Sequence, residues 1–181
     1  MRYWAAVLLF AGTAAFAQPA ETPVPEPPGF RGPPYDGAVP DRLTGARVIG
    51  PQEALELWTA GAHFIDVYPR IIRPEGLPEG TLWRAPIHQT IPGATWLYDT
   101  GHERLSAAEA ARLSDGLAHV TGGDRDAPVV VFCRPDCWMG WNAAKRAVAL
   151  GYRNVHWFPG GTDDWLMVGG DLVGVGADDG L

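Results

Sequence analysis

One stretch of the chain, VVVFCRPDCWMGW at residues 129–141, constrains the fold more than any other. Its first four residues are β-branched or aromatic and contain no polar break, which is typical of a strand buried on both faces. Such strands belong to parallel sheets covered by helices, and these sheets bind ligands at the carboxyl ends of their strands. Because the run ends on Cys133, we expect its sulfur to lie at such an end.

The segments on either side of this stretch alternate between strand and helix patterns. That alternation predicts an α/β fold with a mostly parallel sheet in a single domain. Ser106 and Glu109 form the capping box that marks the start of one helix. In chain order we expect strands at residues 48–49, 63–68, 81–83, 129–133 and 155–158, and helices beginning near residues 51, 106, 140 and 162.

The first 17 residues have the pattern of a secretory signal peptide. Arg2 supplies the basic residue, an apolar run follows, and AFA at residues 15–17 fits the small-x-small cleavage rule. No second apolar stretch of about 20 residues follows, so the sequence predicts an exported, periplasmic protein with no membrane segment after cleavage.

Proline dominates the segment that follows, residues 18–42. Proline fixes the backbone and removes a hydrogen-bond donor, so we expect an extended arm or linker without sheet pairing. Phe30 and Tyr35 are the residues expected to hold it against the domain. The globular domain is then expected at residues 43–168, with an irregular tail or weak edge hairpin at residues 169–181.

Charge and cysteine content narrow the function classes. The chain carries 14 basic and 21 acidic residues, a net charge of −7, which argues against nucleic acid as a partner. The two cysteines, Cys133 and Cys137, are local to one loop rather than spread through the chain as disulfide staples are. In an oxidising compartment they would tend to form a disulfide with each other.

Several motifs in order resemble those of rhodanese-like domains, over about residues 46–168. They are FIDV at 64–67, IPGA at 91–94, VVVFCR at 129–134, ALGY at 149–152 and PGG at 159–161 followed by Trp165. The resemblance implies a three-layer sandwich with a central, mostly parallel sheet of about five strands flanked by helices. The Cys133, Cys137 and Trp138 motif more narrowly resembles a periplasmic Cys-Cys-Trp family associated with catabolism dependent on pyrroloquinoline quinone (PQQ).

This resemblance also implies roles for individual residues. In rhodaneses the cysteine after the central strand carries a persulfide, and Cys133 occupies that position. A thiolate where a loop enters a helix N-terminus meets amide dipoles that favour its ionised form. We therefore expect Cys133 and Cys137 to be the catalytic pair. The expected loop and pocket residues are Arg134, Asp136, Trp138, Trp141 and Arg84, and Asp66 is expected to be structural.

Two details refine these expectations. Asp136, Cys137 and Trp138 stand where active sulfurtransferases carry a glycine and then a basic residue, and a carboxylate near the sulfur repels anionic donors such as thiosulfate. Asp66 needs a partner if it is buried, and the candidates are Arg70, Arg73 and Arg84. Arg84 would either make that salt bridge or line the pocket.

Four interpretations of the two-cysteine loop stay open in the sequence. The first is thiol–disulfide exchange by the pair, against which stands a purely structural bridge that shapes the loop. The second is persulfide transfer at Cys133 resolved by Cys137. The third is a non-catalytic binding or delivery module for a quinoprotein dehydrogenase, its electron-transfer partner or PQQ itself, with the loop tryptophans as the contact. The fourth is a Cu(I) or Zn site that adds His88 or His156 to the thiolates. No resident cofactor or metal is assigned, and the only cofactor link is to PQQ.

Overall fold

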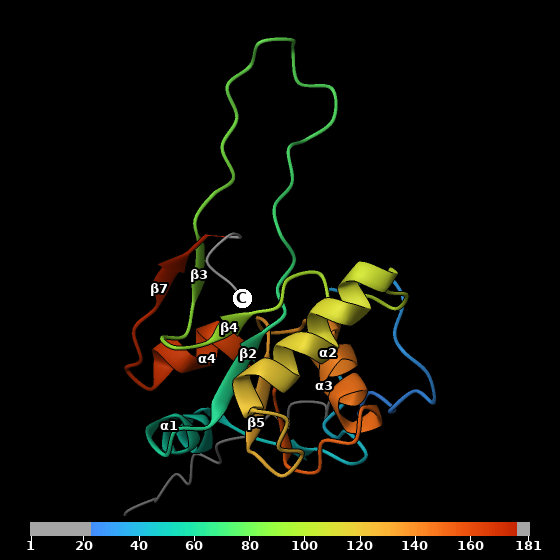
Figure 1. Cartoon of the computed structure of the whole chain (residues 1–181), viewed down its shortest axis with the longest axis vertical. Helices are drawn as coiled ribbons and strands as arrows, with labels where there is room; N and C mark the ends of the chain where they lie inside the picture. Colours follow the sequence, from blue (N-terminus) through green and yellow to red (C-terminus); the bar gives the residue numbers. More distant parts are fainter. Residues whose placement is uncertain (1–22, 177–181) are drawn as a thin grey trace, which may run out of the picture.

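The computed structural model describes residues 23–176, so the predicted signal peptide at residues 1–17 lies outside the described residues. Its centre is a five-stranded sheet in which every neighbouring pair is parallel (Figure 1). The order is β1-β6-β5-β2-β4, which confirms the predicted α/β class and parallel sheet. The strands are β1 (Arg47–Val48), β2 (His63–Asp66), β4 (Thr95–Trp96), β5 (Val129–Phe132) and β6 (Val155–Phe158).

Helices cover both faces of this sheet, because the side chains of the central strand alternate between two cores. Val129 and Val131 of β5 pack in one core, while Val130 and Phe132 pack in the other. All four residues of β5 are fully buried, as its unbroken apolar run predicts. The first core includes α2 (Ala107–Thr121) and α3 (Trp138–Ala149), and the second includes α1 (Pro51–Thr59) and α4 (Gly161–Met167).

Local signals account for the helix starts. Pro51 occupies the first turn of α1, where its missing N–H has no intrahelical partner to lose. The Ser106 hydroxyl accepts the Glu109 N–H while the Glu109 carboxylate accepts the Ser106 N–H, so the predicted capping box of α2 is confirmed.

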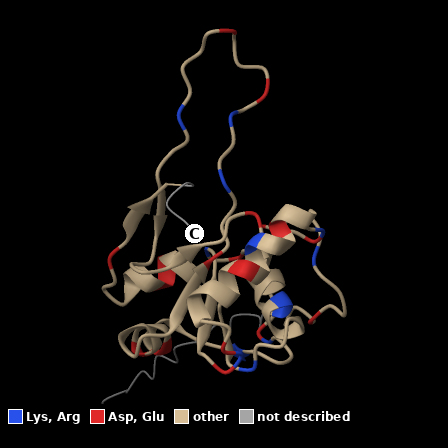
Figure 2. Ribbon diagram, viewed as in Figure 1, with Lys and Arg blue, Asp and Glu red and all other residues tan. Residues whose placement is uncertain are grey.

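A long loop, residues 67–87, takes the place of the strand expected at 81–83, and that prediction is wrong. The loop projects from the body of the molecule (Figure 1), and Leu82 in it is 99% exposed. Its apolar residues have no neighbouring strand to pair with, and strand formation depends on such neighbours. Figure 2 shows basic residues along both limbs of the loop and acidic residues near its tip.

The loop ends in β3 (His88–Thr90), which pairs antiparallel with β7 (Val173–Val175) to form a separate two-stranded sheet. The chain from residue 169 is therefore not irregular throughout. A three-residue strand with a central glycine carries too little pattern to be predicted from sequence.

The proline-rich arm, from residue 23 onward, lies along the domain and is held there by polar contacts. Asn142 of α3 accepts the Arg31 N–H at 2.8 Å and donates to the Arg31 carbonyl at 2.9 Å. The Arg146 guanidinium lies 3.9 Å from the centre of the Phe30 ring. Unlike the predicted arm, this one makes an isolated bridge between Asp36 and Cys137. Within the described range, no helix has the length and hydrophobicity that crossing a bilayer requires.

Candidate active site

The carboxyl ends of the central strands gather the candidate residues at one edge of the sheet. Asp66, the last residue of β2, is in register with Phe132 of β5, and Phe132 is in register with Phe158 of β6. Cys133 follows Phe132 directly, as the buried strand predicts. Gly161 and Thr162, which begin α4, follow the end of β6 closely.

The two cysteines form a disulfide, so the predicted bridge is confirmed. Their Cα atoms are 6.3 Å apart, within the usual range for disulfides. The chain reverses between them at Asp136, whose φ of 54° lies in the left-handed region. Both cysteines are only 3% exposed, so solvent reaches the bridge only through a local opening.

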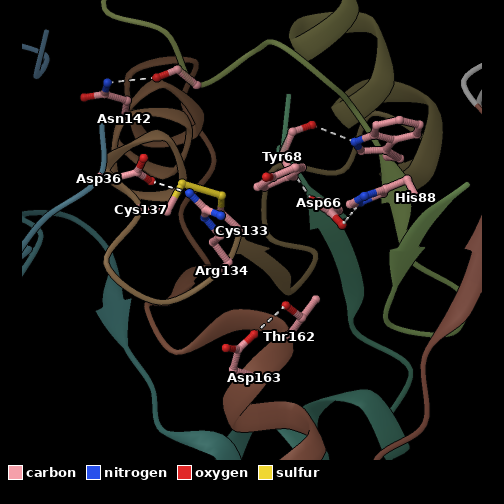
Figure 3. Close-up of a disulfide and its surroundings, with 12 residues drawn as sticks. Asp36, Asp66, Tyr68, His88, Cys133, Arg134, Cys137, Asn142, Thr162 and Asp163 are labelled. Atoms are coloured by element: carbon pink, nitrogen blue, oxygen red, sulfur yellow. Dashed lines mark hydrogen bonds and ion pairs between the residues drawn. A yellow bond between two sulfur atoms is a disulfide. The ribbon is translucent and has the colours of Figure 1, made fainter. Parts of the chain in front are cut away.

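That opening is a cavity of about 200 Å³ beside Cys133. Figure 3 labels all of its lining residues except Gln89. Cys133 is one of the lining residues and Cys137 is not, so a molecule in the cavity contacts Cys133 rather than Cys137. Its lining residues are Asp66, Tyr68, His88, Gln89, Cys133, Arg134, Thr162 and Asp163.

Arg134 forms one wall of the cavity, as expected, but its charge is already paired. Its Nη2 donates to Asp36 Oδ1 of the arm at 2.6 Å, and its guanidinium lies 5.4 Å from the centre of the Tyr68 ring. The hydrogen bond to Asp36 raises the pKa of Arg134, so the guanidinium stays charged. Because Asp36 and Asp163 offset this cation, the cavity is not a strongly anion-attracting site.

Asp66 is buried and receives three hydrogen bonds. The Tyr68 N–H donates to Oδ1 at 2.8 Å, and the Thr90 hydroxyl and His88 Nε2 both lie 2.7 Å from Oδ2. None of these partners is one of the three arginines that the sequence suggests. Arg70 instead pairs with Asp99 at 3.0 Å.

A stack of aromatic rings holds His88 in place. Its ring lies 4.2 Å from the Trp96 ring and 5.5 Å from the Tyr68 ring, measured between centroids, and is nearly parallel to Tyr68. His88 is the functional candidate that sequence reasoning missed as a pocket residue. It lies 22 positions from its partner Asp66, beyond the long loop, and no motif marks it.

Comparison with known families decides the assignment. The model of the rhodanese-like domain matches residues 72–167, more than half of the chain. This protein belongs to the rhodanese-like domain family. No curated protein matches the chain. Among solved structures it is similar to the 30 kDa polysulfide-sulfur transferase homodimer from Wolinella succinogenes, with 21% identity over 71% of this chain and 79% of that chain, and a TM-score of 0.43.

In this rhodanese-like domain, the two tryptophans after Cys137 are core residues rather than cavity walls. Trp141 is fully buried and donates through Nε1 to the Arg42 carbonyl at 3.2 Å. Trp138 is 5% exposed and packs edge-on against Trp141, with 5.6 Å between ring centroids. The expectation that they line the pocket is therefore not met.

Two charged candidates also lie elsewhere. Arg84 is exposed on the 67–87 loop, and it neither pairs with Asp66 nor lines the cavity. Asp136 is exposed, and its part in the loop is through its backbone, since its carbonyl accepts the Gly37 N–H at 2.9 Å.

The arm hydrogen-bonds to the end of the cysteine loop, where α3 begins. The Tyr35 carbonyl accepts the N–H of Trp138, the first residue of α3, at 2.8 Å. This amide is therefore used by the arm rather than pointed at the sulfur. The opposite side of the loop is fixed by the Thr162 N–H, which donates to the Cys133 carbonyl at 3.3 Å.

Nothing in the described residues favours the metal interpretation. Across residues 23–176 there is no cluster of three or more histidine, cysteine or acidic side chains suited to a metal ion. His156 lies on β6 and is hydrogen-bonded through Nε2 to Asn154 at 3.0 Å, and burial lowers its pKa. It is not among the residues that line the cavity.

Proposed function

We propose that this rhodanese-like domain exchanges sulfur at Cys133, with Cys137 as the second thiol of the reaction. The observation that carries the proposal is the arrangement of the bridge: Cys133 opens onto the cavity, while its disulfide partner lies behind it at the start of α3.

The position of the cavity on the Cys133 side of the bridge sets the direction of the exchange. An incoming thiolate attacks Cys133 Sγ, a mixed disulfide forms, and the electron pair of the broken bond leaves on Cys137 Sγ. Cys137 is the N-cap residue of a 12-residue helix, where amide dipoles stabilise a thiolate. A second thiol then attacks the mixed disulfide, which gives a small-molecule or protein disulfide and the free Cys133–Cys137 dithiol.

In the reduced state the same pair can process sulfane sulfur. The Cys133 thiolate takes the outer sulfur of a persulfide donor, RSSH, and releases the thiol RSH. Cys137 then attacks Cys133 Sγ, which expels hydrosulfide and re-forms the bridge. The balance is RSSH plus two protein thiols giving RSH, hydrogen sulfide and the disulfide, and the thiol exchange above restores the dithiol.

Trapping the intermediate tests this proposal. The protein carrying Cys137→Ser should hold a mixed disulfide with an added thiol, or a persulfide after treatment with a persulfide donor, on Cys133. Intact-mass spectrometry under non-reducing conditions would detect both adducts, and Cys133→Ser serves as the matched control. The proposal fails if Cys133 stays unmodified in Cys137→Ser, or if Cys133→Ser accumulates the adduct on Cys137 instead.

The setting that we propose is the periplasm, in service of a PQQ-dependent alcohol oxidation system. The support is the leader pattern of residues 1–17 and the Cys133, Cys137 and Trp138 motif. Cell fractionation of the source organism should find the processed protein in the periplasm. Loss of the gene should slow growth on alcohols that need quinoprotein oxidation, and Cys133→Ser should fail to restore it. Full growth of the deletion strain would contradict the link.

One observation favours the alternative, a non-catalytic partner of a quinoprotein dehydrogenase. The 67–87 loop exposes Ile72 by 71% and Leu82 by 99%, and Arg73 and Arg84 in it have no ion-pair partner among the described residues. Apolar residues flanked by arginines fit an apolar groove with an acidic rim on a partner protein.

Stacking of PQQ on the loop tryptophans is not part of this alternative, because Trp138 and Trp141 are buried. Binding of the purified dehydrogenase that is weakened by Leu82→Ser and by Arg84→Glu, but unchanged by Cys133→Ser, would support the alternative. Equal binding by all three variants would remove the loop from consideration.

A further inference from the structure

A carboxylate and a histidine face the disulfide across the cavity. Asp66 and His88 line it together with Cys133 and Arg134. Figure 3 shows Asp66 and His88 on one side and the cysteine loop on the other. No motif of the sequence assigns a role to this pair, and the sulfur chemistry described above does not use it.

The hydrogen bonds of Asp66 decide which nitrogen of His88 carries the proton. A carboxylate offers only acceptor atoms, so each of its three partners must donate. The His88 Nε2–H therefore points at Asp66 Oδ2, over 2.7 Å. In the neutral ring this leaves the lone pair on Nδ1. No hydrogen bond joins Nδ1 to another of the described residues, and His88 is one of the residues that line the cavity.

The position of the ring is fixed from two more directions. Tyr68 lies parallel to one face of His88, with an interplanar angle of 3°, and Trp96 stacks on it at 24°. Trp96 is itself anchored, because its Nε1 donates to the Tyr68 carbonyl at 2.7 Å. A ring held by a buried carboxylate and two aromatic neighbours is pre-organised for proton transfer rather than free to rotate.

We propose that His88 is a catalytic acid–base residue of exchange at Cys133, that Asp66 is its positioning residue, and that the substrate of this step is a thiol. The inference rests on the sulfur exchange proposed above. His88 Nδ1 takes the proton from the incoming RSH, and the resulting thiolate attacks Cys133 Sγ. The Cys133–Cys137 bond breaks onto Cys137 Sγ, which leaves as a thiolate. In the following step the second thiol gives its proton to the Cys137 thiolate and attacks the substrate sulfur of the mixed disulfide, and the proton held on His88 Nδ1 passes to Cys133 Sγ as it leaves.

The groups around His88 are compatible with this role. Besides Asp66, the charged residues facing the cavity are Arg134 from the loop after β5 and Asp163 from α4, and Tyr68 is the remaining titratable neighbour. Histidine is the side chain best suited to proton transfer near neutral pH. A positioned base of this kind contributes about 10²-fold or more to the rate.

The test is the rate at which dithiothreitol reduces the bridge in the full-length protein, measured between about pH 5 and pH 9. Rapid alkylation followed by mass spectrometry counts the two new thiols. In His88→Gln the amide nitrogen can still donate to Asp66, but no base remains. We expect its rate constant at neutral pH to fall by about 10²-fold and its difference from the wild type to shrink as the pH rises, because thiols ionise unaided at high pH.

Three further variants sharpen the result. His88→Ala should regain rate when imidazole is added, which a purely structural histidine would not show. Asp66→Asn should change the shape of the pH profile, since the amide no longer fixes the proton on Nε2. His119→Gln, at an exposed position of α2, is the control and should match the wild type throughout.

The outcomes separate this inference from the function on which it rests. If the wild-type bridge is reduced normally and His88→Gln follows the same pH profile, His88 is not the base and only this inference is overturned. If the wild type itself resists thiols, or Cys137→Ser cannot be trapped at Cys133, the proposed sulfur exchange fails. A folded His88→Ala that imidazole does not rescue also contradicts the acid–base role.

Discussion

The attachment of the arm to α3 gives a quantitative test of the structure. Asn142 is fully buried and joins three segments: it accepts from the Arg31 N–H and donates to the carbonyls of Arg31 and Gly101, at 2.8 to 2.9 Å. Asn142→Ala removes all three bonds. At about 1 kcal/mol for each hydrogen bond, the expected loss is about 3 kcal/mol of unfolding free energy.

The three bonds do not contribute equally. The Arg31 groups belong to an exposed residue and can turn to water once released, whereas the Gly101 carbonyl lies in a buried bond and is left unsatisfied. An unsatisfied buried group costs about 1–3 kcal/mol by itself, so the core part of the loss should persist even if the arm detaches.

Thermal unfolding and limited trypsin digestion measure the two parts. For a domain of this size, a loss of about 3 kcal/mol corresponds to a midpoint lower by about 6–12 °C. Cleavage after Arg31 should become faster because the arm is freed. Lys145→Gln is the matched control, since Lys145 also bonds to the arm, through the carbonyls of Pro27 and Pro28, but at a partly exposed position. The reasoning is refuted if Asn142→Ala lowers the unfolding free energy by less than about 1 kcal/mol, or if trypsin cleaves after Arg31 no faster in the variant than in the wild type.

Three further predictions test the loop, a helix cap and the pH response. Gly161 has a φ of 50°, and a Cβ there would collide with the Cys133 carbonyl, so Gly161→Ala should displace the cysteine loop and change the rate of disulfide reduction as well as the melting temperature. Ser106→Ala removes the cap of α2 and should cost about 1 kcal/mol in urea unfolding, with a cost near zero contradicting the capping box. Burial lowers the pKa of His156 below its ordinary 6.5, so the unfolded chain binds a proton that the folded chain does not, and unfolding free energy should decrease as the pH falls below 6.5. In His156→Gln this decrease of unfolding free energy below pH 6.5 should be smaller. If the dependence on pH is unchanged, other titratable groups cause the decrease.

The fold was predictable because its strongest signals are local. The unbroken apolar run of β5 indicates a strand buried on both faces, and the capping box and first-turn proline mark helix starts within a few residues. The strand expected at residues 81–83 failed for the opposite reason. The sequence of residues 81–83 favours a strand as much as that of β3 does, but a strand forms only where it has a pairing partner. β3 pairs with β7, about 85 residues further along the chain, whereas residues 81–83 pair with no strand among the described residues.

The site was predictable only where sequence neighbours are also spatial neighbours. Cys133, Cys137 and Arg134 follow one strand, so their proximity needs no long-range information. Trp138 shows the limit of this reasoning, because a tryptophan at the start of a helix has the same spacing whether it faces a cavity or the core. His88 was missed because only the folded sheet brings β3 beside the end of β2.

The contacts of the arm use groups of the cysteine loop that would otherwise bind an anionic sulfur donor. Asp36 of the arm neutralises Arg134, the Tyr35 carbonyl takes the first amide of α3, and the remaining charged wall residues, Asp66 and Asp163, are acidic. A small anionic sulfur donor would therefore find neither a free cation nor that amide, whereas a neutral thiol needs only a base and an accessible sulfur. In the exchange that we propose, His88 and Cys133 supply those two groups from facing sides of one cavity, so the contacts of the arm and the stack around His88 favour the same class of substrate.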